Sequence, residues 1–81
     1  MYKINENLIM REEDNSLFSL ENMEIYEFNE VGFKAILIFN EEKIENYSQW
    51  EKEVSKIENL DISDLNEFWQ NLIDVKILEE K

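Results

Sequence analysis

The chain has 81 residues, a formal net charge of −12 from 20 acidic and 8 basic side chains, and neither cysteine nor histidine. A chain of this length forms one small domain and buries about 60% of the surface that its unfolded form would expose. Disulfides, thiolate metal sites, thiol catalysis and a histidine general base are all excluded. The charge disfavours nucleic-acid binding, which depends on neutralising phosphates with Lys and Arg. It favours a basic or neutral partner, or is simply a solvated acidic surface.

Neither a signal peptide nor a membrane span is predicted. The first residues carry little positive charge, and no long apolar run follows them. The longest apolar run, residues 35–39, is far shorter than the roughly 20 residues that a span needs. We therefore expect a cytoplasmic protein with no membrane partner, encoded on its own as a single domain over residues 1–81.

Three short apolar runs, separated by polar clusters, predict a three-stranded antiparallel meander. They are residues 8–11, 17–20 and 23–28. Asn15 and Asn22 stand where glycine is expected in the two turns. Because Asn tolerates a positive φ better than other non-glycine residues, both turns are feasible.

At Asn29 the apolar spacing changes from that of a strand to that of a helix. Asn29 is a good N-cap for this first helix, and Asn40 is expected to end it in the left-handed conformation. A second helix is predicted to open with the capping-box pattern of residues 48–51, with Ser48 as its cap. Residues 59–61 are expected to end this second helix.

The third helix has the clearest pattern. Its apolar residues fall at i, i+3, i+4, i+7 and i+8: Leu65, Phe68, Trp69, Leu72 and Ile73. Asp61 or Ser63 is the expected cap, and residues 75–78 either end the helix or form a short extended tail. Three strands followed by three helices predict a small α+β domain.

The acidic residues do not form a catalytic or metal-binding pattern. The pairs Glu12/Glu13 and Glu41/Glu42 lie in polar turns, where water keeps both carboxylates of a pair ionised. Residues 12–14 also lack the spaced ligands and central glycine of a calcium loop. One glycine in the chain is too few for a phosphate loop. We therefore expect no enzyme activity, no metal and no cofactor.

Most aromatic residues stand at core spacing. Those expected simply to fill the core are Phe18, Phe28, Phe33, Phe39, Trp50 and Phe68. Trp69 and Tyr26 are also suited to a wet interface, because each combines an apolar body with a polar tip. The apolar stripe of the third helix is wide enough that part of it could line a groove beside the third strand.

Glu24, Glu27 and Glu30 flank that third strand. One interpretation is that their charges discourage aggregation at an exposed sheet edge. The other is that the edge accepts an incoming peptide strand whose charge these acids select. The spacing of the residues alone leaves both interpretations open.

The chain also resembles PqqD-like proteins over nearly its whole length. The resemblance is carried by residues 2–7, 11–14, 17–18, 25–32 and 61–69, with Leu72 and residues 77–78. Its most specific part is the Asn-Glu-x-Gly pattern of residues 29–32 after an alternating strand. The usual turn glycines are replaced by Asn15, Asn22 and Asn40, and the glycine near the end of the last helix is matched by Lys76.

The resemblance implies a RiPP recognition element with a winged helix-turn-helix-like fold. Such a domain captures the leader of a ribosomally synthesised precursor peptide by strand addition and presents it to a modifying enzyme, such as a radical-SAM maturase. Carried onto this chain, the strand would contribute Glu24, Ile25, Tyr26, Glu27 and Phe28. The helical wall would consist of Leu65, Phe68, Trp69 and Leu72, with Asp64 as a polar contact.

Two other functions remain as alternatives. A winged-helix regulator would use the third helix to read nucleic acid, but residues 61–74 contain no Lys or Arg. An acidic inhibitor or nucleic-acid mimic would instead occupy a basic groove on another protein. This second alternative needs carboxylates clustered at phosphate-like spacing.

Overall fold

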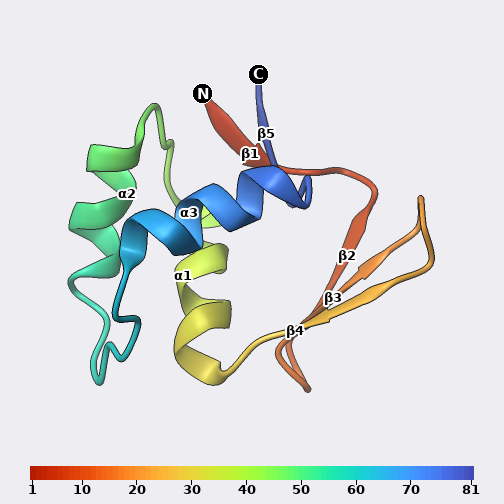
Figure 1. The fold of residues 1–81 in the computed structure, drawn as a ribbon, viewed down its shortest axis with the longest axis horizontal. Helices are drawn as coiled ribbons and strands as arrows, with labels where there is room; N and C mark the ends of the chain where they lie inside the picture. The colour runs from red at the N-terminus through yellow and green to blue at the C-terminus, as the bar shows by residue number, and fades with distance from the viewer.

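The computed structural model describes all 81 residues and confirms the α+β fold class (Figure 1). The elements, in chain order, are β1 (Tyr2–Ile4), β2 (Leu8–Arg11), β3 (Ser16–Ser19), β4 (Ile25–Glu27), α1 (Glu30–Glu41), α2 (Tyr47–Val54), α3 (Leu65–Asp74) and β5 (Leu78–Glu80). Strands β2, β3 and β4 form an antiparallel sheet with β3 in the centre, as the predicted meander requires. We call this sheet the wing. No helix combines the length and apolarity needed to cross a membrane.

A second, two-stranded sheet joins the ends of the chain and was not predicted. Strand β1 pairs antiparallel with β5, with Tyr2 opposite Glu80 and Ile4 opposite Leu78. The N–H of Lys81 also donates to the carbonyl of Met1 at 2.7 Å, and Figure 1 shows the two termini side by side. Residues 75–78, expected either to end the third helix or to form an extended tail, contain both features: Val75 is the C-cap of α3, and β5 begins at Leu78. The partner of β5 is the start of the chain.

Helix α1 begins where the sequence predicts and ends differently. The Asn29 side chain accepts a hydrogen bond from the N–H of Gly32 at 2.7 Å, which confirms the N-cap. The prediction for Asn40 is wrong, because the helix continues through Glu41 and is capped by Glu42 in an extended conformation with φ of −128°. No left-handed residue is needed there, since the chain leaves α1 directly in an extended path.

The predicted caps of the other two helices are also wrong. Asn46, not Ser48, caps α2, and it accepts from the N–H three residues later at 3.0 Å. Asp64, not Asp61 or Ser63, caps α3 in the same way at 3.0 Å. Each of these segments offers several competent capping side chains, and tertiary packing decides which one begins the helix.

In one of the two wing turns, the positive φ falls on a different residue from the one predicted. Asn15 has a φ of 55°, as expected for its turn. In the β3–β4 turn, however, the left-handed residue is Met23, with a φ of 59°, and not Asn22. Asn22 supports this turn with its side chain, which accepts from the N–H of Glu24 at 3.1 Å. An Asx side chain thus stabilises a turn whose positive φ falls on its neighbour.

The core is largely aromatic and is centred on Trp50. This side chain is fully buried, and its indole N–H donates to the carbonyl of Ala35 at 3.0 Å. Its ring lies 5.4 Å from that of Trp69 and 6.1 Å from that of Phe39. Phe33 and Phe39 are buried as predicted, whereas Phe28 and Phe68 are half-buried and pack against the edge of the core.

Phe18 is an exception to the predicted core. It stands opposite Ile9 on β2 and Ile25 on β4, in a row on the outer face of the wing, where Ile9 is 48% and Ile25 52% exposed. The neighbouring residue Leu17 is fully buried instead. Side chains alternate along a strand, so burying Leu17 necessarily turns Phe18 outward.

Candidate peptide-binding groove

Strand β4 is an edge of the wing, and its register shows which backbone groups are unpaired. The carbonyl of Glu24 accepts from Ser19 at 2.8 Å, and the N–H of Phe28 donates to Asn15 at 3.0 Å. Hydrogen-bonded and non-hydrogen-bonded positions alternate along an antiparallel pair. The carbonyl of Glu24, the backbone groups of Tyr26 and the N–H of Phe28 therefore point toward β3, and the backbone groups of Ile25 and Glu27 point away from the sheet.

The side chains of β4 alternate between two environments. Tyr26 and Phe28 are half-buried and pack against the core, whereas Ile25 and Glu27 are exposed. Tyr26 and Phe28 are therefore the side chains of β4 that face inward. An added strand would place every second side chain on the same inner face as these two.

A groove runs between β4 and α3 on this inner side. Its volume is about 370 Å³, and seven of its nine lining residues are hydrophobic. The lining consists of Ile25, Tyr26, Glu27, Phe28, Phe68, Asn71, Leu72, Val75 and Ile77. The rings of Phe28 and Phe68 meet edge to face across it, with 6.3 Å between their centroids. The structure thus brings together six of the ten predicted site residues.

Three of the other predicted residues lie outside this groove. Trp69 is only 6% exposed and packs within the core, where its ring lies 4.8 Å from that of Tyr2. Leu65 faces a different hollow, beside α2. Glu24 is exposed at the turn end of β4 and does not line the groove. In the helical stripe only one face, including Phe68 and Leu72, is turned toward β4.

Three lining residues were not predicted: Asn71, Val75 and Ile77. Asn71 follows Phe68 by three positions and Val75 follows Leu72 by three, so helical spacing could have suggested both. Val75 is 46% exposed at the C-cap of α3. Ile77 could not have been found in this way, because it lies beyond the helix, where the chain has changed direction.

Lys76 causes that change of direction. Its φ is 63°, its N–H donates to Ile73, and the N–H of Ile77 donates to Leu72 at 2.9 Å. These two hydrogen bonds form a Schellman motif, in which the left-handed position is usually glycine. Lys76 therefore occupies the conformation of the glycine that the resemblance leads one to expect, and the path of the tail is preserved.

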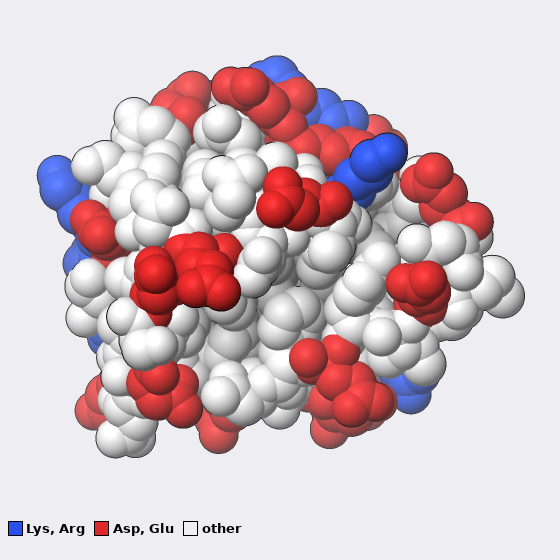
Figure 2. Space-filling model, in the orientation of Figure 1, with Lys and Arg blue, Asp and Glu red and all other residues white.

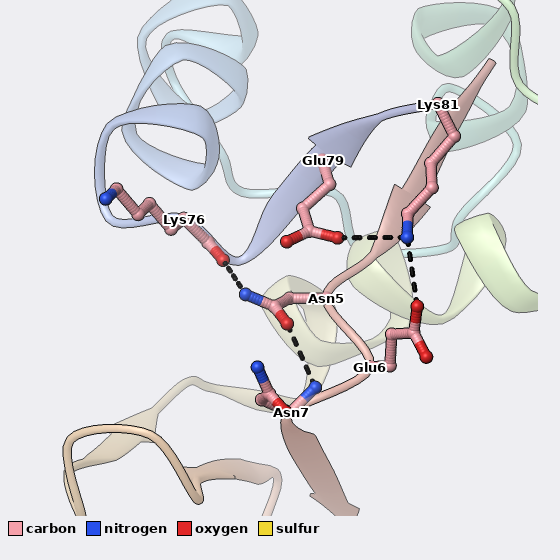
Figure 3. Close-up of polar contacts among 6 residues, drawn as sticks. All are labelled: Asn5, Glu6, Asn7, Lys76, Glu79 and Lys81. Atoms are coloured by element: carbon pink, nitrogen blue, oxygen red, sulfur yellow. Dashed lines mark hydrogen bonds and ion pairs between the residues drawn. The ribbon is translucent and has the colours of Figure 1, made fainter.

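Asn5 holds this turn from the other end of the chain (Figure 3). Its side-chain amide donates to the carbonyl of Lys76 at 3.1 Å, and its own N–H donates to the carbonyl of Ile77 at 2.8 Å. Asn5 is 7% exposed, and its side-chain oxygen accepts from the N–H of Asn7 at 2.9 Å. A satisfied polar residue between β1 and β2 thus positions Ile77 at the end of the groove.

A second hollow, of about 480 Å³, adjoins the groove at the Phe28 end. We call it the acidic hollow, because four acidic residues and no basic residue line it: Glu27, Asp61, Asp64 and Glu67. Asp64, the predicted polar contact, lies here and also caps α3. In Figure 2 acidic side chains surround a hollowed, mostly uncharged centre of this face. Nowhere in the molecule do three or more potential ligands form a group that could hold a metal ion.

Comparison of the chain with protein-family models, with curated proteins and with solved structures finds no match. The site therefore has to be interpreted from its own geometry. That geometry consists of an open strand edge, an apolar groove beside it, and a cluster of carboxylates at one end.

Proposed function

We propose that this protein is a non-catalytic peptide-binding adaptor that acts in the cytoplasm. Its ligand is the leader of a ribosomally synthesised precursor peptide, which adds to β4 as a fourth strand of the wing. The adaptor delivers the peptide to a separate modifying enzyme, such as a radical-SAM maturase. The PqqD-like resemblance supports the choice of a leader peptide and of this class of enzyme.

The observation that carries the proposal is the coincidence of the open edge with the groove. Ile25 and Glu27 offer backbone donors and acceptors to an incoming strand, and the hydrophobic lining lies directly beside them. In strand addition, main-chain hydrogen bonds supply affinity and side-chain pockets supply specificity. Both components are provided here by one short stretch of chain and one helix face.

The adaptor would promote modification by raising an effective concentration. A leader held on the adaptor, with the adaptor held on the enzyme, makes the encounter of the core peptide with the active site intramolecular. A short flexible linkage of this kind gives effective concentrations of the order of millimolar. No chemical group of the adaptor needs to take part in the reaction.

The direct test is calorimetric titration of the folded protein with the leader of a short precursor peptide encoded beside its gene. We expect saturable one-to-one binding that is lost when the leader is scrambled. An absence of binding by all neighbouring leaders, from protein shown to be folded, would contradict the proposal.

Two variants of one residue show whether binding uses the strand edge. Ile25→Pro removes an outward-facing N–H, which edge strands tolerate, together with the isoleucine side chain, and we expect it to weaken binding by roughly tenfold. Ile25→Ala keeps this N–H and removes the side chain, so it is the matched control. Equal affinities of the two variants would argue against strand addition.

A further inference from the structure

We infer that the peptide strand added to β4 carries a lysine or arginine beside its apolar residues, and that the acidic hollow binds this cationic side chain. The inference rests on the proposed function, because it describes the ligand of the same groove. It adds a sequence requirement, an apolar patch followed by a positive charge, that strand addition by itself does not impose.

The first support is continuity between the groove and the acidic hollow. Four residues line both: Glu27, Phe28, Phe68 and Asn71. A strand rises about 3.3 Å per residue, so a peptide that lies along Ile25–Glu27 reaches the acidic hollow within one or two further residues. Its inward-facing side chains, which are every second residue, would therefore occupy the two hollows in turn.

The second support is that the four carboxylates have no cationic partner within the protein. No ion pair involves Glu27, Asp61, Asp64 or Glu67. The nearby Glu30 differs in this respect, because Lys34 pairs with it at 3.3 Å. A cation placed among these acidic residues would reduce their mutual repulsion, which no basic side chain of the protein offsets.

The positive N-terminal ends of two helices at the acidic hollow do not reverse its preference for a cation. Helices α1 and α3 both begin at the acidic hollow, and each N-terminus carries roughly half a positive charge. The caps Asn29 and Asp64 already accept hydrogen bonds from these first turns. About one unit of positive charge is thus opposed by four carboxylates, so an anionic ligand is disfavoured and a cation is favoured.

The floor shared by the two hollows also suits a long basic side chain. Phe28 and Phe68 are half-buried there, with their rings edge to face. Lys and Arg pack their methylene stems on apolar surface while the charged head remains in a polar site. The aromatic floor and the acidic wall therefore match the two parts of such a side chain.

A selection experiment tests this inference without knowledge of the natural ligand. A display library of random 12-residue peptides is selected against the immobilised full-length protein and, in parallel, against the D61N/E67Q variant. Both substitutions remove charge with little change in shape. The side-chain oxygen that D61N retains can still accept the hydrogen bond from the Asn29 amide, at 3.5 Å, and neither substitution removes the cap bonds that Asn29 and Asp64 accept. The matched control is E41Q/E42Q, which removes two charges at the far end of α1.

We expect wild-type and E41Q/E42Q proteins to enrich peptides with alternating apolar residues and a Lys or Arg at a constant distance from them. For a selected peptide, D61N/E67Q should weaken binding by roughly three- to tenfold and reduce its dependence on salt. Replacing the basic residue of the peptide by glutamine should have the same effect on wild-type protein and little effect on the variant.

Two outcomes would overturn the inference, and they differ in what they mean for the proposed function. Enriched apolar peptides without a basic residue, or with one that D61N/E67Q leaves unaffected, would refute the cation site while preserving strand addition. Enrichment of no peptide, or of peptides whose binding is unchanged in Ile25→Pro, would refute both proposals.

Discussion

The wing and the helical half of this domain differ in how much of each is buried. Of the 12 hydrophobic residues that form the core, only Leu17 comes from β2, β3 and β4. The remainder belong to the helices, to β5 and to the segments that join them. Conversely, four of the five large exposed hydrophobic residues lie in the wing or in its β3–β4 turn: Ile9, Leu20, Met23 and Ile25.

Under the proposed function, this difference separates the residues that stabilise the fold from those that bind the peptide. The helical half, tied together by β1 and β5, contains the packing that keeps the chain folded. The wing contributes an edge at which the outward-facing backbone groups of Ile25 and Glu27 have no partner strand within the molecule. Substitutions in the core should therefore change the free energy of unfolding, whereas substitutions in the wing and groove should change peptide affinity in a protein that still folds.

The largest loss of stability is expected from Trp50→Ala. This change removes a fully buried ring and the hydrogen bond that its indole N–H donates to the Ala35 carbonyl. Phe/Trp-to-Ala changes in cores cost about 3–5 kcal/mol, a large part of the roughly 5–10 kcal/mol that a small domain has. Urea unfolding followed by circular dichroism measures the change. A loss below about 1 kcal/mol would show that Trp50 is not the centre of the core.

Leu17→Ala tests the one residue of the wing that belongs to the buried core. Leu17 is fully buried, so its truncation should cost about 2–5 kcal/mol in the free energy of unfolding. The control is Ile9→Ala on the outer face, which we expect to change stability by less than about 0.5 kcal/mol. Equal costs in urea unfolding would contradict the assignment of inner and outer faces.

Phe28→Asp should reduce peptide binding while leaving the domain folded. The residue is half-buried at the junction of the two hollows, and a carboxylate there removes the apolar floor. We expect affinity for a bound leader to fall by at least about 30-fold, measured by calorimetry. Leu72→Asp is a poorer test of binding, since Leu72 is only 2% exposed and a buried charge should unfold the chain.

The outcome that would contradict this prediction is unchanged affinity in folded Phe28→Asp protein, which would move the binding site away from the groove. Phe28→Leu is the matched control. It keeps an apolar side chain at the same position and should retain most of the binding. Circular dichroism of both variants shows that the comparison is between folded proteins.

Lys76→Gly should stabilise the protein. The exposed Lys76 has a φ of 63°, a conformation that costs a residue with a side chain about 1–2 kcal/mol. Glycine removes this strain but increases the entropy of the unfolded chain, so we expect a net gain of about 0.5–1 kcal/mol. Thermal unfolding measures it. Lys76→Ala, which keeps the strain, should show no such gain.

The smallest effect is expected at the exposed ion pair of Glu6 with Lys81. The hydrogen bond from the Lys81 ammonium, at 3.0 Å, and its charge lower the pKa of Glu6 below the ordinary value of 4.5. The same contact raises the pKa of Lys81 above 10.5. The stabilisation is therefore fully present between these ordinary values. It is lost as the pH falls through the lowered pKa of Glu6 or rises through the raised pKa of Lys81.

Glu6→Gln tests this pH dependence. At neutral pH the variant should have a slightly lower Tm than the wild type. The difference should disappear in strong acid, where Glu6 of the wild type is protonated, and should shrink in high salt because both side chains are exposed. A difference in Tm that persisted unchanged in acid would show that the ion pair is not its source.

Local patterns in the sequence determined much of this architecture. The alternation of residues 8–28 predicts the meander, the spacing of Leu65, Phe68 and Leu72 predicts the third helix, and Asn29 is correctly predicted as a cap. These features depend on backbone propensity and on the period of the apolar residues within one element. They can therefore be inferred without knowledge of the rest of the chain.

Tertiary structure alone decided three other features. The pairing of β1 with β5 joins residues from opposite ends of the chain. A strand of three residues is too short to show a recognisable alternation of apolar and polar residues in the sequence. Trp69 belongs to the same apolar stripe of α3 as Phe68. It is buried in the core only because α1 and α2 pack against its side of the helix.

The third feature is the open edge itself. The sequence predicts a strand over residues 23–28, but it does not show which backbone groups lack a partner. That depends on the register of β4 with β3 and on the placement of α3 beside the free edge. Both arise from packing between elements, so the groove exists only once the whole domain is folded.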